Sequence, residues 1–151
     1  MSGPGRLRKL HPNDDGTILI LTMFFSALAL LLILVVMAAT SLHLERKRLF
    51  SLADGAALAG AESFDFAAMT IIDGTARPEL SPSAVHQAVQ EYIDGASHAR
   101  FEGLAITQAT TIDGASATVT LHAYWRPPVV SWILPEGVPL DVTSIARSVF
   151  W

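Results

Sequence analysis

The chain has 151 residues, of which 51% are hydrophobic and only 16% are charged, and its mean hydropathy is +0.42. Soluble domains carry about 25% charged residues, so this composition argues against a wholly soluble enzyme and against a disordered chain. No cysteine occurs, which excludes disulfide bonds, cysteine metal ligands and thiol catalysis.

The first predicted element is a membrane-spanning helix within residues 17–41. Its centre, Ile18–Ala39, has 22 residues, and only Thr22 and Ser26 among them are polar. A helix of this length spans about 33 Å, close to the ~30 Å hydrocarbon core of a bilayer. Two alternatives are a buried core helix of a soluble protein and a secretory signal cleaved near 38–41. The length of the run and the basic residues after it favour the anchor.

Basic residues flank the apolar run symmetrically. Three precede it and three follow it: Arg6, Arg8, Lys9, Arg46, Lys47 and Arg48. The positive-inside rule therefore does not decide the orientation, because both flanks carry the same number of basic residues. The size of the C-terminal part favours an orientation with residues 1–16 in the cytoplasm and the C-terminal part outside the cytoplasmic (inner) membrane. From Leu49 onward four arginines face eleven acidic residues. Such a surface repels a phosphate backbone, so no nucleic-acid partner is expected.

The apolar run leads into a predicted stem helix over residues 42–66. Apolar and small residues recur at three- and four-residue steps up to Phe64, which is typical of one amphipathic stripe. Gly55 and Gly60 either break the helix or allow another helix to approach closely. The predicted packing residues are Ala53, Asp54, Gly55, Ala56, Ala59 and Gly60. Small residues at this spacing suit lateral packing against a partner helix, although packing on the chain's own sheet is equally compatible.

The same region carries a family resemblance. An acidic pair and glycine at 14–16, the apolar run, the basic cluster at 45–48 and the Ala-Asp-Gly-Ala-Ala-Leu-Ala motif at 53–59 resemble the N-terminal module of TadE/TadG-like proteins of tight-adherence (Flp-type) pilus systems. The similarity covers about residues 14–64. It implies a bitopic, pilin-like accessory component with its C-terminal domain outside the membrane.

One position departs from the pilin-like pattern. Pilin-like precursors resemble a glycine followed by an apolar stretch with glutamate at the fifth mature position. Counted from Thr17 after Gly16, the fifth residue is Leu21. Gly16 and Thr17 are therefore the candidate processing site, but we expect the N-terminal segment to be retained.

The remaining residues, 67–151, predict a small α+β domain. Residues 72–78 are typical of a loop, and Ser81-Pro82 begins a helix that ends near Gly95. Alternating residues predict two strands over 104–112 and 115–125, joined by a two-residue Asp113-Gly114 turn, and a third strand over 140–150. The expected fold class is α+β: the membrane helix continuing into a long stem, a second amphipathic helix and a three-stranded antiparallel sheet.

No catalytic motif is present. The five histidines lack the spacing of a helical metal site, and no paired carboxylates suit acid–base catalysis, so we expect no enzyme activity, metal, cofactor or small-molecule substrate. The most hydrophobic stretch outside the anchor is a candidate interface patch or part of the core. Its residues are Trp125, Val130, Trp132, Ile133 and Leu134.

The sequence therefore predicts a structural or assembly component that acts through helix packing. Its expected partners are the lipid bilayer and other pilin-like membrane proteins, and replacement of Gly60 by Leu is expected to disturb their association. The alternative is a membrane-tethered, extracytoplasmic module that binds a ligand or partner, which requires a deep apolar pocket with convergent polar groups.

Overall fold

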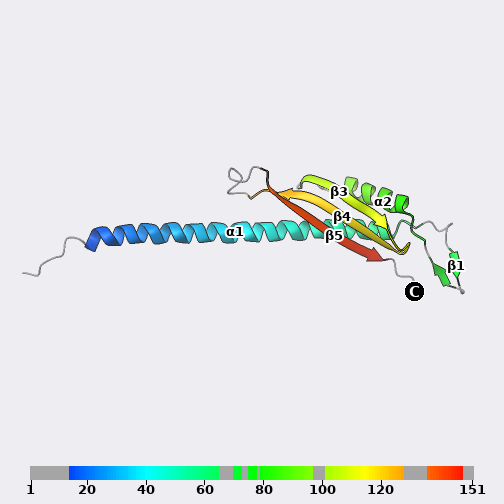
Figure 1. The fold of residues 1–151 in the computed structure, drawn as a ribbon, viewed down its shortest axis with the longest axis horizontal. Helices are drawn as coiled ribbons and strands as arrows, with labels where there is room; N and C mark the ends of the chain where they lie inside the picture. Colours follow the sequence, from blue (N-terminus) through cyan, green and yellow to red (C-terminus); the bar gives the residue numbers. More distant parts are fainter. Residues whose placement is uncertain are drawn as a thin grey trace, which may run out of the picture. The chain divides into compact units, whose positions relative to one another are not determined.

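The computed structural model describes residues 14–64, 70–72, 75–77, 79–96, 101–127 and 136–147. A long N-terminal helix, a second helix and a three-stranded antiparallel sheet confirm the predicted α+β class (Figure 1). The chain divides into two compact units, Met1–Met37 and Ala38–Trp151. The elements in chain order are α1 (Asp14–Ala61), β1 (Thr70–Ile72), β2 (Thr75–Arg77), α2 (Pro82–Gly95), β3 (Glu102–Thr111), β4 (Ser116–Trp125) and β5 (Val138–Arg147).

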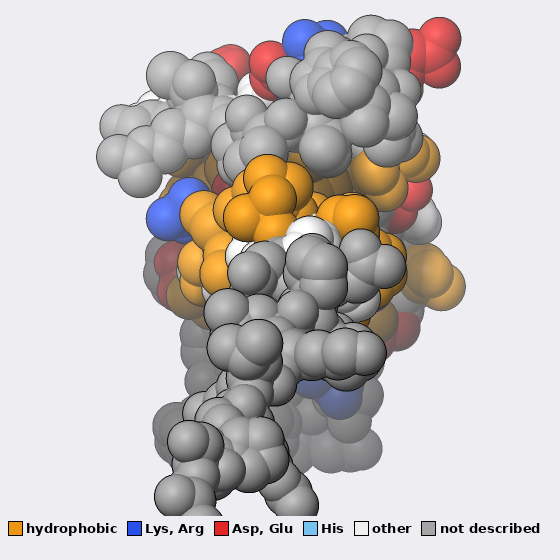
Figure 2. All heavy atoms as spheres, turned by 90° about the vertical axis from the view of Figure 1, so that its left-hand side faces the viewer, with side chains coloured by type: hydrophobic (Ala, Val, Ile, Leu, Met, Phe, Trp, Pro, Cys, Tyr) orange, Lys and Arg blue, Asp and Glu red, His pale blue; other side chains and the backbone are white. Residues whose placement is uncertain are grey.

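The described part of the first unit is helical throughout, and its apolar side chains are exposed. Apart from the half-buried Leu34, the large hydrophobic residues here keep accessible fractions from 46% at Leu28 to 71% at Ile20. Helix Gly16–Ala61 is long and apolar enough to cross a membrane, and its most apolar window has a mean hydropathy of 3.0 with no residue buried. In the view from the left-hand side of Figure 1, hydrophobic side chains gather in the middle of the coloured surface (Figure 2).

Helix α1 continues through both of its internal glycines and ends at Ala61. The end is fixed by Ser63, whose hydroxyl donates to the carbonyl oxygen of Gly60 at 2.7 Å and whose backbone N–H donates to the same oxygen at 3.3 Å. These bonds satisfy a carbonyl that would otherwise lack a helical partner. The helix therefore stops about three residues before the predicted end at Phe64.

The main sheet has the order β3-β4-β5, with antiparallel pairing throughout. The predicted two-residue turn between its first two strands is wrong, because β3 ends at Thr111 and β4 begins at Ser116. The Asp113 carboxylate organises this longer connection by accepting from the backbone N–H groups of Ala115 and Ser116 at 3.0 and 2.7 Å. These bonds, the Ala115 N–H first, lower the pKa of Asp113 to about 2. Gly114 supplies the positive φ of 67° that the turn requires.

Helix α2 begins and ends as the sequence predicts. Ser81 is extended and its hydroxyl oxygen accepts from the N–H of Ala84 at 3.2 Å, with Pro82 in the first turn. Val85, Val89 and Ile93 form the buried face. Tyr92, one residue before Ile93, is 39% exposed, and its phenol lies beside Gly55 of α1.

One predicted loop contains regular structure. Within residues 72–78, where we expected a loop, β2 pairs antiparallel with β1, and Ile72 lies opposite Thr75. Strands of three residues give no readable alternation. The glycine and proline residues at 74–78 therefore predicted a loop, and the sequence pattern did not predict the pairing of β1 with β2.

The core of the second unit lies between the helices and one face of the sheet. Within this unit, the last part of α1 and helix α2 lie on the same side of β3-β4-β5 (Figure 1). The buried residues from α1 are small, whereas those from α2 and the sheet are larger. The fully or nearly fully buried set includes Leu49, Ala53, Ala56, Ala57 and Ala61 of α1, Val85, Val89 and Ile93 of α2, and Val119, Leu121 and Val142 of the sheet.

Candidate functional site

Three of the six predicted packing residues of the stem are buried against the chain's own domain. Ala53 and Ala56 have no accessible surface, Gly60 is buried, and Ala59 is half-buried. All three buried residues face α2 and the sheet. Ala53, Ala56 and Gly60 therefore show the intramolecular packing mode that the sequence left open. Asp54 is exposed and Gly55 and Ala59 are half-buried, and lateral packing of this region against a partner helix stays a prediction.

Gly60 lies at the closest approach of three elements. A Cβ atom at this position would lie 3.1 Å from Ala117 Cβ and 3.2 Å from both Val85 Cγ1 and Val89 Cγ2. Those neighbours come from β4 and α2. Glycine therefore allows the helix to sit against the sheet and the second helix at the same time.

Gly55 has a different environment. A Cβ atom at Gly55 would collide with the phenol of Tyr92. Tyr92 is 39% exposed, so its side chain can move toward solvent. The two glycines of the motif thus differ in their neighbours: Gly60 contacts buried side chains, whereas Gly55 contacts a partly exposed side chain that can move.

Two side-chain hydrogen bonds attach helix α1 to the sheet. The Ser144 hydroxyl, on β5, donates to Asp54 Oδ1 at 3.0 Å, and the Trp125 indole N–H, on β4, donates to Ser41 Oγ at 3.3 Å. Asp54 is the polar residue of the predicted packing motif, and it satisfies the buried Ser144. Sequence reasoning missed both bonds because their partners are separated by 90 and 84 positions.

The candidate interface patch is only partly described. Trp125 is 8% exposed and belongs to the core, which is the alternative that the sequence left open for it. Val130, Trp132, Ile133 and Leu134 lie outside the described residues.

The candidate processing residues lie in the first turns of α1. Gly16 and Thr17 are both exposed, and a Cβ atom at Gly16 would meet no other atom within 4 Å.

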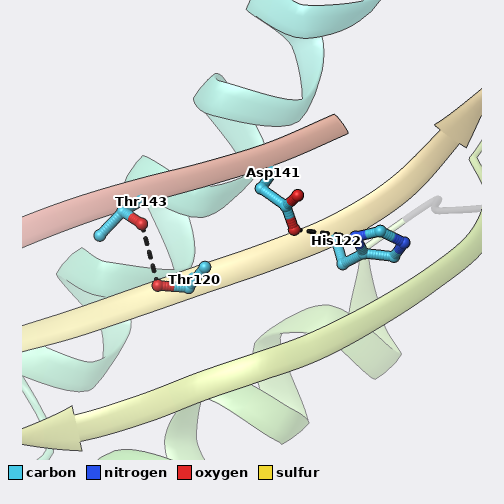
Figure 3. Close-up of polar contacts among 4 residues, drawn as sticks. All are labelled: Thr120, His122, Asp141 and Thr143. Atoms are coloured by element: carbon cyan, nitrogen blue, oxygen red, sulfur yellow. Dashed lines mark hydrogen bonds and ion pairs between the residues drawn. The ribbon is translucent and has the colours of Figure 1, made fainter. Parts of the chain in front are cut away.

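The outer face of the sheet carries two cross-strand polar pairs (Figure 3). His122 Nδ1 lies 2.8 Å from Asp141 Oδ1, and the hydroxyls of Thr120 and Thr143 lie 2.9 Å apart. The ring of Tyr124 stacks edge-on against His122 with centroids 4.9 Å apart. Cross-strand pairs of this kind stabilise the contact between β4 and β5.

A metal centre requires several ligands from one place. Among the residues that the structure describes, no three histidine, aspartate or glutamate side chains gather closely enough to hold a metal ion.

The match to a known family covers the long helix. Residues 16–63 match the family described as putative Flp pilus-assembly TadE/G-like, which confirms the resemblance seen in the sequence. The match spans about a third of the chain and nearly all of α1. It therefore includes the helical residues that pack on the domain. Neither the curated proteins nor the solved structures contain a significant match to this chain.

Proposed function

We propose that the chain is a membrane-anchored, pilin-like structural or assembly component of a bacterial tight-adherence (Flp) pilus or a related secretion apparatus. The observation that carries the proposal is that the family match at 16–63 coincides with one helix. The first half of this helix exposes apolar side chains, and the second half builds a domain core. Such a helix serves both as a membrane anchor and as part of the core of the α+β domain.

In this proposal, residues 1–16 are cytoplasmic, 17–41 cross the membrane, 42–66 form the stem and 67–151 form the small extracytoplasmic α+β domain. Exposure of a continuous face of leucine and isoleucine to water is unfavourable in free energy. Insertion of this face into the hydrocarbon core of a bilayer removes that cost. The size of the C-terminal domain supports an inside N-terminus, and the similarity to pilus-assembly proteins supports the inner membrane.

The proposed mechanism is geometric and uses no catalysis or cofactor. The anchor holds the subunit in the membrane. The domain is attached to the stem through the bond between Asp54 and Ser144, and to the end of the membrane segment through the bond between Ser41 and Trp125. Lateral contacts with other pilus-assembly proteins then use the side of α1 that its own domain leaves open, where Leu44 and Leu58 are 48% and 51% exposed.

The alternative, a tethered ligand-binding module, depends on a deep apolar pocket with convergent polar groups. No observation in the described residues favours it over the assembly role.

Intact-mass measurement of the protein extracted from washed membranes tests the proposal. We expect the full-length mass, because the departure at Leu21 disfavours processing after Gly16. Loss of sixteen residues would contradict retention of the N-terminal segment and indicate a processed pilin. A soluble product lacking about forty residues would contradict the anchor itself, since it would show that the apolar run is a cleaved signal.

A further inference from the structure

A basic recess lies on α1 just beyond the apolar run. Its described lining consists of His43, Arg46, Lys47 and Phe50, and its volume is about 290 Å³. Arg46 and Lys47 each lie three or four positions from both His43 and Phe50, so the four residues share one side of the helix. All four belong to the second unit.

The positive charge of this recess is not neutralised by a neighbouring carboxylate in the described part of the chain. Arg48, the third basic residue of the cluster, pairs with Glu45 at 3.5 Å on another side of the helix. Arg46 and Lys47 are exposed and form no such pair with a described residue. The next carboxylate on the side of the recess, Asp54, accepts from Ser144. Within the described part of the chain, an anion entering the recess would displace no ion pair of Arg46 or Lys47.

Its position suits the headgroup layer of a bilayer. Arg46 follows Ala39, the last residue of the apolar run, by seven positions, which is about 10 Å along a helix axis. Helical side chains tilt toward the N-terminus, so Arg46 and Lys47 lean back toward the apolar run. The polar layer on each side of the hydrocarbon core is roughly 5–8 Å thick, within reach of these long side chains.

We propose that this recess binds the phosphate group of an anionic phospholipid in the leaflet on the side of the C-terminal domain. The inference rests on the proposed membrane anchor. Arg46 and Lys47 supply charge-assisted hydrogen bonds to the phosphate oxygens, and a ring N–H of His43 supplies a further donor. Phe50, which is 50% exposed, lines the end of the recess that is farther from the apolar run. The continuity of the recess with the apolar run favours a lipid over an acidic protein, because the bilayer brings lipid phosphates to this level of the helix.

Native mass spectrometry of the full chain tests the proposal. The protein is released from micelles that contain equal amounts of phosphatidylglycerol and phosphatidylcholine, and the retained lipids are counted. We expect wild type to retain phosphatidylglycerol preferentially. Removal of one cation, as in Arg46→Gln or Lys47→Gln, should lower that preference roughly fivefold, and the double variant should abolish it.

Arg48→Gln is the matched control, since it removes the same charge from the same cluster but from a residue outside the recess. Its preference should stay close to wild type. Equal retention of both lipids by wild type, an equal loss in Arg48→Gln, or full displacement of the anionic lipid by millimolar inorganic phosphate would each overturn the proposal. Failure of the chain to float with lipid vesicles would instead contradict the anchor, whereas flotation without a lipid preference would contradict only the recess.

Discussion

Replacement of Gly60 by leucine should destabilise the C-terminal unit by about 3 kcal/mol and lower its Tm by roughly 10–20 °C. A Cβ at this position already lies within 3.2 Å of atoms from Ala117, Val85 and Val89, and the rest of a leucine side chain has no space. Because these neighbours belong to two different elements, relief requires the helix to move away from both. Thermal unfolding of the full chain in detergent, followed by circular dichroism, measures the effect.

Gly55→Ala is the control for this experiment. It removes a helix-interior glycine, which favours the helix by about 1 kcal/mol, and only the exposed Tyr92 must move. Its Tm should therefore equal or slightly exceed that of wild type. An unchanged Tm for Gly60→Leu together with lost cross-linking to partner proteins would contradict the intramolecular assignment of Gly60. It would restore the sequence-based expectation of lateral packing at this residue.

The second large effect is expected in the anchor. Leu28→Arg combined with Leu32→Arg should move the protein out of carbonate-washed membranes, because each arginine at the centre of a spanning helix costs about 2.5–3.5 kcal/mol on insertion scales. Both leucines are exposed in the structure, at 46% and 62%. The substitutions therefore disturb no described core contact. The fractions of protein in membrane pellet and supernatant measure the effect.

Leu28→Ile with Leu32→Ile keeps the apolar character and should remain in the membrane pellet. Retention of the double arginine variant in the pellet at the wild-type level would show that residues 18–39 do not hold the protein in the bilayer.

The two helices and the three main strands were predictable because each has a strong local signal. The uncharged run defined α1, Ser81-Pro82 defined the start of α2, and alternation over 115–125 defined β4. In each case the local preference agrees with the final packing. The same logic failed for β1 and β2, which are too short to show a period.

The destination of the small-residue face was not predictable from the sequence. Small residues permit close approach to any surface, whether that surface is a neighbouring helix or the chain's own sheet. The structure distinguishes these cases through long-range contacts such as Gly60 with Ala117 and Asp54 with Ser144. Spacing along one helix carries no information about such pairs.

The central claim is that α1 holds the α+β domain on the outer side of a membrane, and site-specific labelling tests it most directly. The chain has no cysteine, so Ile112→Cys, at a position that is 82% exposed in the β3–β4 connection, introduces a single thiol into the domain. Ser2→Cys, made in a separate variant, provides the matching thiol in the N-terminal segment.

In intact bacterial spheroplasts, a membrane-impermeant maleimide should label the membrane-bound Ile112→Cys variant at once. The same reagent should label the Ser2→Cys variant only after lysis. The opposite pattern before lysis, with the N-terminal thiol labelled and the domain thiol protected, would contradict the account. Recovery of the labelled Ile112→Cys variant in the soluble fraction would contradict it as well.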